Sequence, residues 1–272
     1  MIEWLWWVLP LLGGGLLAGL MAGLFGIGGG LIIVPILFQI YQLQGLSVDV
    51  AMPTAVATSL ATIVFTSMQS ARSHHSRGTL DIALLKRWAP WAFLGAALGV
   101  LTSALLPGAT LKTFFAIFVW AVAAQMIATT LKKTPVDQAP KGQMPAYGWQ
   151  GLYSTVVGQL STILGIGGGT LMVPLLSWHG YSIHRAVGTA AGFGAVISLP
   201  AVLGYAWSGS FIDGRPPLSL GYVHSLAFLV ILPCTLLMAP VGAALAYRLN
   251  GLWLKRLFAI FLIIVGLRMM LS

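Results

Sequence analysis

The sequence predicts an all-α polytopic membrane protein built from two homologous halves. Three observations carry this prediction: the composition, the length of the apolar segments and an internal repeat. Hydrophobic residues make up 58% of the chain and charged residues only 7%, whereas a soluble domain carries about 25% charged residues. One membrane span needs about 20 apolar residues, so a chain of 272 residues can supply several spans.

The apolar segments follow one another with short polar connections. Most of them match a single helical span, and glycine clusters interrupt the first and the fifth. They cover residues 8–40, 51–70, 88–107, 112–131, 151–178, 187–208, 219–247 and 252–271. A polar segment with three prolines lies near the middle of the chain. We therefore expect a first membrane repeat over 1–131, a cytoplasmic linker over 132–148 and a second membrane repeat over 149–272.

Three motifs recur in the same order in the two halves, which is how an internal repeat is recognised. The segments 24–35 and 163–174 are identical at seven of twelve positions, and Gly-Ala-Ala-Leu occurs at 95–98 and at 242–245. The third pair, 111–118 and 254–261, begins with Leu-Lys and ends with Phe-Ala-Ile-Phe. The glycine and Leu-Lys motifs are 85 residues apart in one half (26 to 111) and 89 in the other (165 to 254).

The distribution of the 14 Lys and Arg residues favours inverted rather than parallel halves. With four full spans in each half and the loop 72–87 in the cytoplasm, nine of these cations lie inside and five outside. If each half instead has a re-entrant, glycine-broken first segment followed by three spanning helices, the count becomes eleven against three. The second arrangement obeys the positive-inside rule better. A single tilted, broken span stays open as the alternative for each first segment.

Each half contains a Gly-Ile-Gly-Gly-Gly motif, at 26–30 and at 165–169. Glycine costs about 1 kcal/mol of helix stability relative to alanine, so we expect both helices to unwind here. Such a break exposes a helix N-terminus that suits an anion, and transporters with inverted repeats place these breaks around the substrate. Close helix packing is the alternative role. The predicted substrate-binding residues here are Gly26, Gly28, Gly29, Gly30, Pro35, Gly165, Gly167, Gly168, Gly169, Thr170 and Pro174.

Polar side chains in the neighbouring apolar segments complete the predicted substrate site. Aligning residues 47–59 with 182–194 puts Thr54 opposite Thr189. Buried polar groups in membranes are often functional, and hydroxyl or amide groups can donate to a dehydrated anion. Hydrogen bonding between or within helices is the alternative. The predicted residues are Thr54, Thr58, Ser59, Gln159, Ser161 and Thr189.

The sequence offers no set of residues for catalysis or for holding a metal. All five acidic residues lie at segment ends or in loops, and the histidines lack the spacing of metal ligands. His224 beside Ser225 makes no catalytic pair, and the single cysteine, Cys234, is expected to be an inert buried thiol. The glycine motifs lack the residues of a P-loop. We therefore expect no enzyme, no cofactor and no metal site.

The two glycine motifs, each followed by Val-Pro, resemble those of the sulfite exporter TauE/SafE family. The segments 51–60, 78–81 and 186–190 add to this resemblance, which extends from about residue 8 to 271. It implies a permease with two repeated domains that transports sulfite, thiosulfate, sulfonates or other small sulfur-containing anions. The site role that it implies falls on Gly26–Gly30, Pro35, Thr54, Gly165–Gly169, Pro174 and Thr189. Because Ala190-Ala191 stands where the first half has Thr58-Ser59 nearby, the half-sites are expected to contribute unequally.

The sequence therefore favours a multi-pass transporter of a small, sulfur-containing anion that works by alternating access in the cell inner membrane. An anion channel and a non-transporting sensor or structural membrane protein are the alternatives. The expected partners are a small anionic substrate and the lipid bilayer. A coupling proton and a homodimer stay open. The net charge of +9 does not indicate a nucleic acid, because the basic residues lie between apolar segments instead of forming one face.

Overall fold

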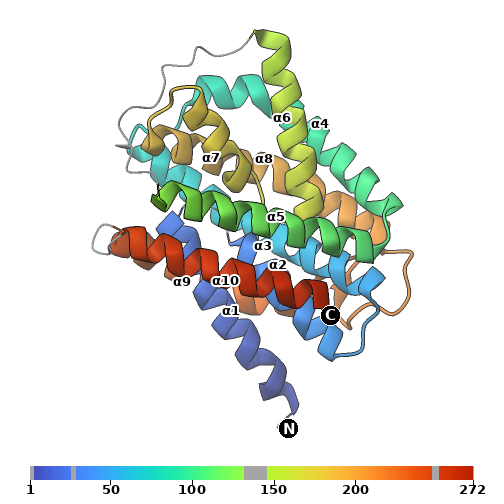
Figure 1. Ribbon diagram of the computed structural model, residues 1–272. Helices are drawn as coiled ribbons and strands as arrows, with labels where there is room; N and C mark the ends of the chain where they lie inside the picture. The colour runs from blue at the N-terminus through green and yellow to red at the C-terminus, as the bar shows by residue number, and fades with distance from the viewer. Residues whose placement is uncertain (1–2, 26–28, 132–145, 247–250, 272) are drawn as a thin grey trace.

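The computed structural model describes residues 3–25, 29–131, 146–246 and 251–271. The described part of the chain forms ten helices and one short hairpin of two antiparallel strands (Figure 1). The first half contains α1 (Glu3–Phe25), α2 (Gly30–Leu43), α3 (Val48–Ser76), α4 (Ile82–Leu105) and α5 (Gly108–Leu131). The second half contains α6 (Tyr147–Leu164), α7 (Gly169–Trp178), α8 (Ile183–Gly209), β1 (Ser219–Leu220), β2 (Val223–His224), α9 (Ser225–Ala246) and α10 (Gly251–Leu271).

Helices α3 and α8 form the centre of the fold and pack against each other. Every residue of α3 from Val50 to Val64 is buried. The two helices run antiparallel, because Gly188 near the start of α8 lies against Thr79, just beyond the end of α3, while Gly194 lies against Ser67. Glycine allows this approach because it has no side chain to separate the helices.

The contacts between helices come in equivalent pairs when the two halves are compared. Helix α1 packs on α9 as α6 packs on α4, and α2 packs on α3 as α7 packs on α8. Helices α5 and α10, which correspond to each other, lie side by side (Figure 1). The repeated Gly-Ala-Ala-Leu motif takes part in this pattern. Gly95 of α4 lies against the Thr155 carbonyl of α6, and Gly242 of α9 lies against the Leu20 carbonyl of α1.

Each glycine-broken segment consists of two limbs that run antiparallel to each other. In the first segment, Gly14 of α1 lies against Ile36 of α2, and Ala18 lies against Gly29. In the second, the rings of Tyr153 on α6 and His179 beyond α7 are 5.9 Å apart. The chain therefore returns toward its starting end within each segment. The predicted interruption of the helices is observed, with α6 ending at Leu164 and α7 beginning at Gly169.

The outer helices expose large apolar side chains, which water would disfavour and lipid accepts. Five of the described helices are long and apolar enough to cross a membrane: α3, α4, α5, α8 and α9. The predicted all-α membrane class is therefore confirmed. Helix α10 has 21 residues but does not belong to this set. Exposed apolar side chains on the outer helices include Leu98, Leu101, Phe114, Ile117, Leu229, Leu237, Ile260 and Ile264.

Two element starts lie near predicted segment boundaries. Helix α6 begins at Tyr147, at the end of the predicted linker 132–148, whose residues 132–145 lie outside the described residues. The apolar segment predicted from residue 219 begins with the β1–β2 hairpin, and α9 starts only at Ser225. Gly221 turns this hairpin with a φ of 56°, a conformation that glycine adopts readily.

Candidate functional site

The second glycine motif forms a helix break with two left-handed residues. Gly165 caps the C-terminus of α6 with a φ of 68°, and Gly167 has a φ of 65°. Only glycine adopts such angles without strain. Helix α7 then begins at Gly169, and its N-cap, Gly168, makes no side-chain cap hydrogen bond. The N–H groups of a first helical turn have no partner within the helix, so this end of α7 presents donors and a partial positive charge.

The two breaks meet at their backbones. A Cβ atom on Gly30, the first residue of α2, would collide with the carbonyl oxygen of Gly165 and would lie 2.6 Å from the Cα atom of Ile166. The hydroxyl of Ser59 on α3 donates to the same Gly165 carbonyl at 2.8 Å. Gly165 in turn lies against the side chain of Val34. Predicted residues Gly30, Ser59 and Gly165 are therefore in one place, whereas Gly26 and Gly28 lie outside the described residues.

Unpaired hydroxyl groups surround the second break. Ser161 and Thr162 lie in the last turn of α6, and Ser198 of α8 lies 3.7 Å from the position of a Cβ on Gly167. All three side chains are fully buried, and their oxygen atoms have no hydrogen-bond partner among the described residues. Thr54 on α3 is a fourth buried hydroxyl without a partner. A buried polar atom without a partner is costly, which makes these four groups candidates for contact with a polar ligand.

Other predicted residues are engaged elsewhere or lie at the edge of this region. The Gln159 amide donates to the Thr102 hydroxyl at 3.0 Å and so joins α6 to α4. Pro35 lines an apolar groove of about 310 Å³ between α1, α2 and α10 that also contains Arg268. Pro174 is half-buried within α7, and Thr170 is buried in the first turn of that helix. Gly29 and Gly168 occupy the two N-cap positions, and Gly169 begins α7.

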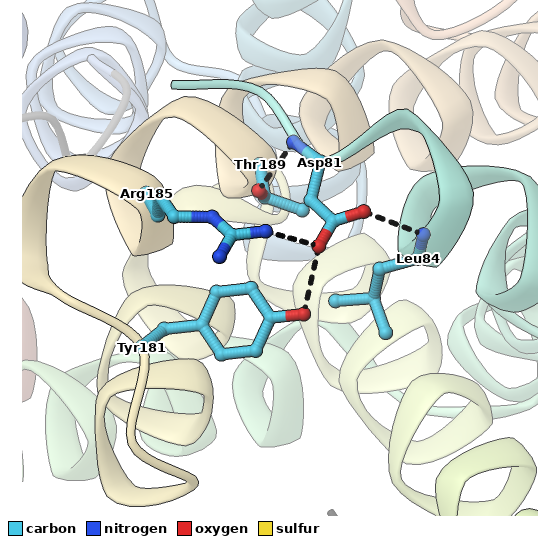
Figure 2. Close-up of polar contacts among 5 residues, drawn as sticks. All are labelled: Asp81, Leu84, Tyr181, Arg185 and Thr189. Atoms are coloured by element: carbon cyan, nitrogen blue, oxygen red, sulfur yellow. Dashed lines mark hydrogen bonds and ion pairs between the residues drawn. The ribbon is translucent and has the colours of Figure 1, made fainter. Parts of the chain in front are cut away.

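Predicted residue Thr189 belongs to a polar cluster between the halves, which we call the Asp81 clamp (Figure 2). The Thr189 hydroxyl accepts a hydrogen bond from the Asp81 backbone N–H at 3.1 Å. The Asp81 carboxylate accepts bonds from the Tyr181 hydroxyl at 2.9 Å and from the Arg185 guanidinium at 2.8 Å. It also caps α4 by accepting from the Leu84 N–H at 3.0 Å. The clamp thus ties the start of α4 to α8 and to Tyr181 in the turn between α7 and α8.

Opposing effects act on the Asp81 carboxyl. Burial alone would raise its pKa, but hydrogen bonds from Leu84 and Tyr181 and the charge of Arg185 outweigh burial and hold the pKa below its usual range. The hydrogen bond between Asp81 and Tyr181 acts on the pKa of Tyr181 in the opposite direction. Burial, followed by the hydrogen bond to Asp81, raises the pKa of Tyr181 to about 12. The pair therefore stays an ionised carboxylate and a neutral phenol across the physiological range.

A second cluster repeats this arrangement with different side chains, and we call it the His224 clamp. The backbone N–H of His224, the residue before α9, donates to the Thr58 hydroxyl of α3 at 3.0 Å. Its ring Nδ1 is hydrogen-bonded to the Tyr41 hydroxyl near the end of α2 at 3.1 Å. In the His224 clamp, a threonine of α3 binds the backbone of the residue before α9. In the Asp81 clamp, a threonine of α8 binds the backbone of the residue before α4. In both clamps, a tyrosine from the end of a broken segment binds the side chain of that same residue.

This equivalence shifts the predicted alignment by one helical turn. The sequence alignment paired Thr54 with Thr189, but the residue whose contact matches that of Thr189 is Thr58. Thr54 has no partner among the described residues, whereas Thr58 and Thr189 both accept backbone bonds. The sequence analysis missed Asp81, Tyr41, Tyr181 and His224. The signal for Asp81 was its position before an apolar helix, where an N-cap is expected.

The fold and the two facing breaks define a polytopic α-helical membrane protein, and comparisons with known proteins agree. The sequence matches the Sulfite exporter TauE/SafE family over residues 11–269. A probable membrane transporter protein of Haemophilus influenzae is 34% identical over 265 residues, which cover 95% of this chain and 96% of the relative. The probable membrane transporter protein YunE of Bacillus subtilis is 26% identical, with 93% of each chain covered. The chain belongs to the Sulfite exporter TauE/SafE family.

Proposed function

We propose that the protein transports a small anion and binds it where the two helix breaks meet. The observation that carries this proposal is the contact of Gly30 with Gly165 and Ile166, beside the unpaired buried hydroxyls of Ser161 and Ser198. Two helix N-termini and a set of hydroxyl donors suit an anion. The family and the relatives named as probable membrane transporters support a transport role.

The anion that we propose is small and contains sulfur, as in sulfite, thiosulfate or a sulfonate. Oxyanions of this kind present several acceptor oxygens, which hydroxyl and backbone N–H groups can match. The three atoms nearest to a Cβ on Gly30, Gly165 or Gly167 belong to backbone, to Val34, Val56 and Ile63, and to the Ser198 hydroxyl. Neutral donors bind an anion reversibly, because they leave no full opposite charge behind when it departs.

We further propose alternating access by two inverted repeats. The ion pair between Asp81 and Arg185 supports this arrangement, since it holds the α3–α4 loop and the start of α8 at the same end of the protein. The bond from the Gly108 N–H to the Asp49 carboxylate, at 2.6 Å, joins the starts of α5 and α3. The antiparallel limbs α1–α2 and α6–α7 support re-entrant first segments, each entering and leaving at one face.

The test is the flux of labelled sulfite, thiosulfate and sulfoacetate in liposomes that contain the purified protein. Gly30→Ala should abolish flux, because its new Cβ would collide with the Gly165 carbonyl and the Ile166 Cα atom of the other break and such overpacking costs about 1–3 kcal/mol. Gly13→Ala is the matched control, since a Cβ there meets nothing within 4 Å. It should transport normally.

Single substitutions of the unpaired hydroxyls sharpen the test. Ser161→Ala and Ser198→Ala remove donors without adding bulk, so they should weaken apparent affinity while membrane insertion and thermal stability are retained. Normal flux in Gly30→Ala and in both serine variants would refute the site. Conductance without saturation would favour an anion channel instead, and no flux of any of the three anions in the unchanged protein would favour a sensor or structural role.

A further inference from the structure

The two clamps share their backbone geometry but differ in the side chain at the centre. The Asp81 clamp holds a carboxylate between a tyrosine and an arginine, whereas the His224 clamp holds an imidazole against a tyrosine. Both central residues precede a helix and both donate their backbone N–H to a threonine of the opposite half. Equivalent positions with different titration chemistry are an observation that neither the fold nor the breaks explain.

The clamps also lie at different depths along the central helix α3. The Asp81 clamp adjoins its C-terminal end, because Gly188 lies against Thr79. Thr58, which belongs to the His224 clamp, lies 18 residues before the last residue of α3, Ser76. At 1.5 Å per residue this separation is about 27 Å, close to the thickness of a hydrocarbon core of about 30 Å.

We propose that the two clamps are the gates at the two ends of the transport pathway, and that His224 is the site at which a coupling proton binds. The inference rests on the proposed transport function. Each clamp joins a broken segment, a central helix and the start of an outer helix, so its opening would separate the halves at one end. With the Asp81 clamp facing the cytoplasm, as the positive-inside rule predicts, the His224 clamp faces the other side.

The surroundings of His224 contain few groups that could hold its charge. Tyr41 on α2, Tyr205 on α8 and Tyr222 in the hairpin are the phenols on the elements around it, and α9 has no Asp, Glu, Lys, Arg or His. Charged groups on this side include Asp49 and Arg215, which both act on Tyr222, and Asp213, which is exposed in the same loop as Arg215. Asp49 is bound to the N–H of Gly108. The ring of His224 therefore faces neutral partners.

Burial lowers the pKa of His224 to about 4 in the closed clamp. Opening to water would return the pKa toward its ordinary value of 6.5, so the open state binds the proton more tightly. A lowered pKa means that the closed clamp is favoured above pH 6.5 and is weakened as the pH falls below that value. Linkage therefore makes the equilibrium constant for opening about 30-fold larger at pH 5 than it would be without proton binding. At pH 7.5 the same equilibrium constant is essentially unchanged.

The Asp81 clamp should not respond over this range. Although burial opposes ionisation, hydrogen bonds and Arg185 keep the pKa of Asp81 below its usual range, so the carboxylate stays charged from pH 7.5 to pH 5. The same acidification therefore opens one gate and leaves the other closed. Such a difference is what proton coupling in an alternating-access transporter requires.

The test follows clamp opening directly, without a substrate. Hydrogen exchange of peptides covering residues 219–230 reports the His224 N–H, which is bound to Thr58 when the clamp is closed. In the full-length protein in liposomes, opening corrected for intrinsic exchange should rise about 25-fold between pH 7.5 and pH 5. His224→Gln keeps a hydrogen-bonding group of similar size but cannot be protonated, so the rise should disappear. In Asp81→Asn the rise should remain.

The outcomes separate this inference from the transport function. A pH-independent exchange in the unchanged protein, or an unchanged rise in His224→Gln, overturns the proton site. If His224→Gln does not fold, Tyr41→Phe decides, because removing the bond to Nδ1 should increase opening at pH 7.5. If Tyr41→Phe and the unchanged protein open equally at pH 7.5, the proposal is also overturned. Thiosulfate keeps its charge over this range, so its flux is measured in parallel. A rise in exchange without flux of any anion refutes transport and supports the proton site.

Discussion

Removing the carboxylate of Asp81 should destabilise the protein far more than removing the charge of its ion-pair partner. The carboxylate caps α4 through Leu84, which contributes about 1 kcal/mol, and accepts from the Tyr181 hydroxyl, a bond to a charged group that contributes about 1.5–3 kcal/mol. The Arg185 side chain is 56% exposed, and such ion pairs contribute only about 0–1 kcal/mol. The expected order of destabilisation is therefore Asp81→Ala, then Tyr181→Phe, then Arg185→Gln.

Thermal unfolding of the purified protein in detergent, followed by tryptophan fluorescence, measures this order. Asp81→Ala should cost about 2–4 kcal/mol and Arg185→Gln less than about 1 kcal/mol. The matched control is Arg72→Gln, which removes an exposed cation at the same end of α3 and should leave the midpoint unchanged. The reasoning is refuted if Arg185→Gln lowers the midpoint as much as Asp81→Ala.

The pH dependence of the same variants gives a second measurement. The pKa of Asp81 is below its ordinary value of 3.8 in the folded protein. Its stabilising contribution is therefore fully present above that value and is lost as the pH falls through the folded pKa. The difference in midpoint between the unchanged protein and Asp81→Asn should be constant from pH 7 to pH 5 and shrink below about pH 4. A difference that shrinks between pH 7 and pH 5 would contradict the assignment.

Two further predictions concern the second break and the arrangement in the membrane. Gly167→Ala should lower the unfolding midpoint, because a Cβ would lie 2.8 Å from Ile63 Cγ2 at a φ of 65°. The decrease that Gly167→Ala causes should be smaller in an Ile63→Ala background, where the clash is absent and the strained φ remains. In a Cys234→Ala background, cysteines placed at the exposed positions Ser76 and Asp213 should be labelled by an impermeant maleimide from opposite sides of a sealed vesicle. Labelling of both from one side would contradict inverted repeats.

The membrane class and the helix breaks could be predicted because each depends on local chemistry. Long apolar segments have no stable place in water, and four glycines in five residues destabilise a helix wherever it lies. The predicted interruption matches the end of α6 at Leu164 and the start of α7 at Gly169. The duplication of the motif also indicated that the breaks would be related, but the contact of Gly30 with Gly165 depends on the tertiary structure.

The clamps could not be predicted because they depend on contacts between distant residues. The Asp81 backbone meets a side chain 108 residues away, and the His224 backbone meets one 166 residues away. No local pattern distinguishes Thr58 from Thr54, since both lie in a helix whose residues 50–64 are all buried. His224 carried even less signal, because a single histidine before an apolar helix is compatible with many surroundings.

The difference between the clamps matches what the proposed transport function requires of a duplicated chain that works in one direction. Two identical halves with opposite orientations would have equal closed states, and then no gradient could favour one over the other except through the substrate itself. The backbone bonds to Thr58 and Thr189 preserve the shared geometry of the two gates. The side chains do not: Asp81 is fixed by Arg185 and Tyr181, whereas Tyr41 is hydrogen-bonded to Nδ1 of His224. In the proposed cycle, a histidine and a carboxylate of lowered pKa at equivalent positions make the two closed states differ in proton affinity between pH 5 and pH 7.5, so a pH difference across the membrane can do work on the cycle.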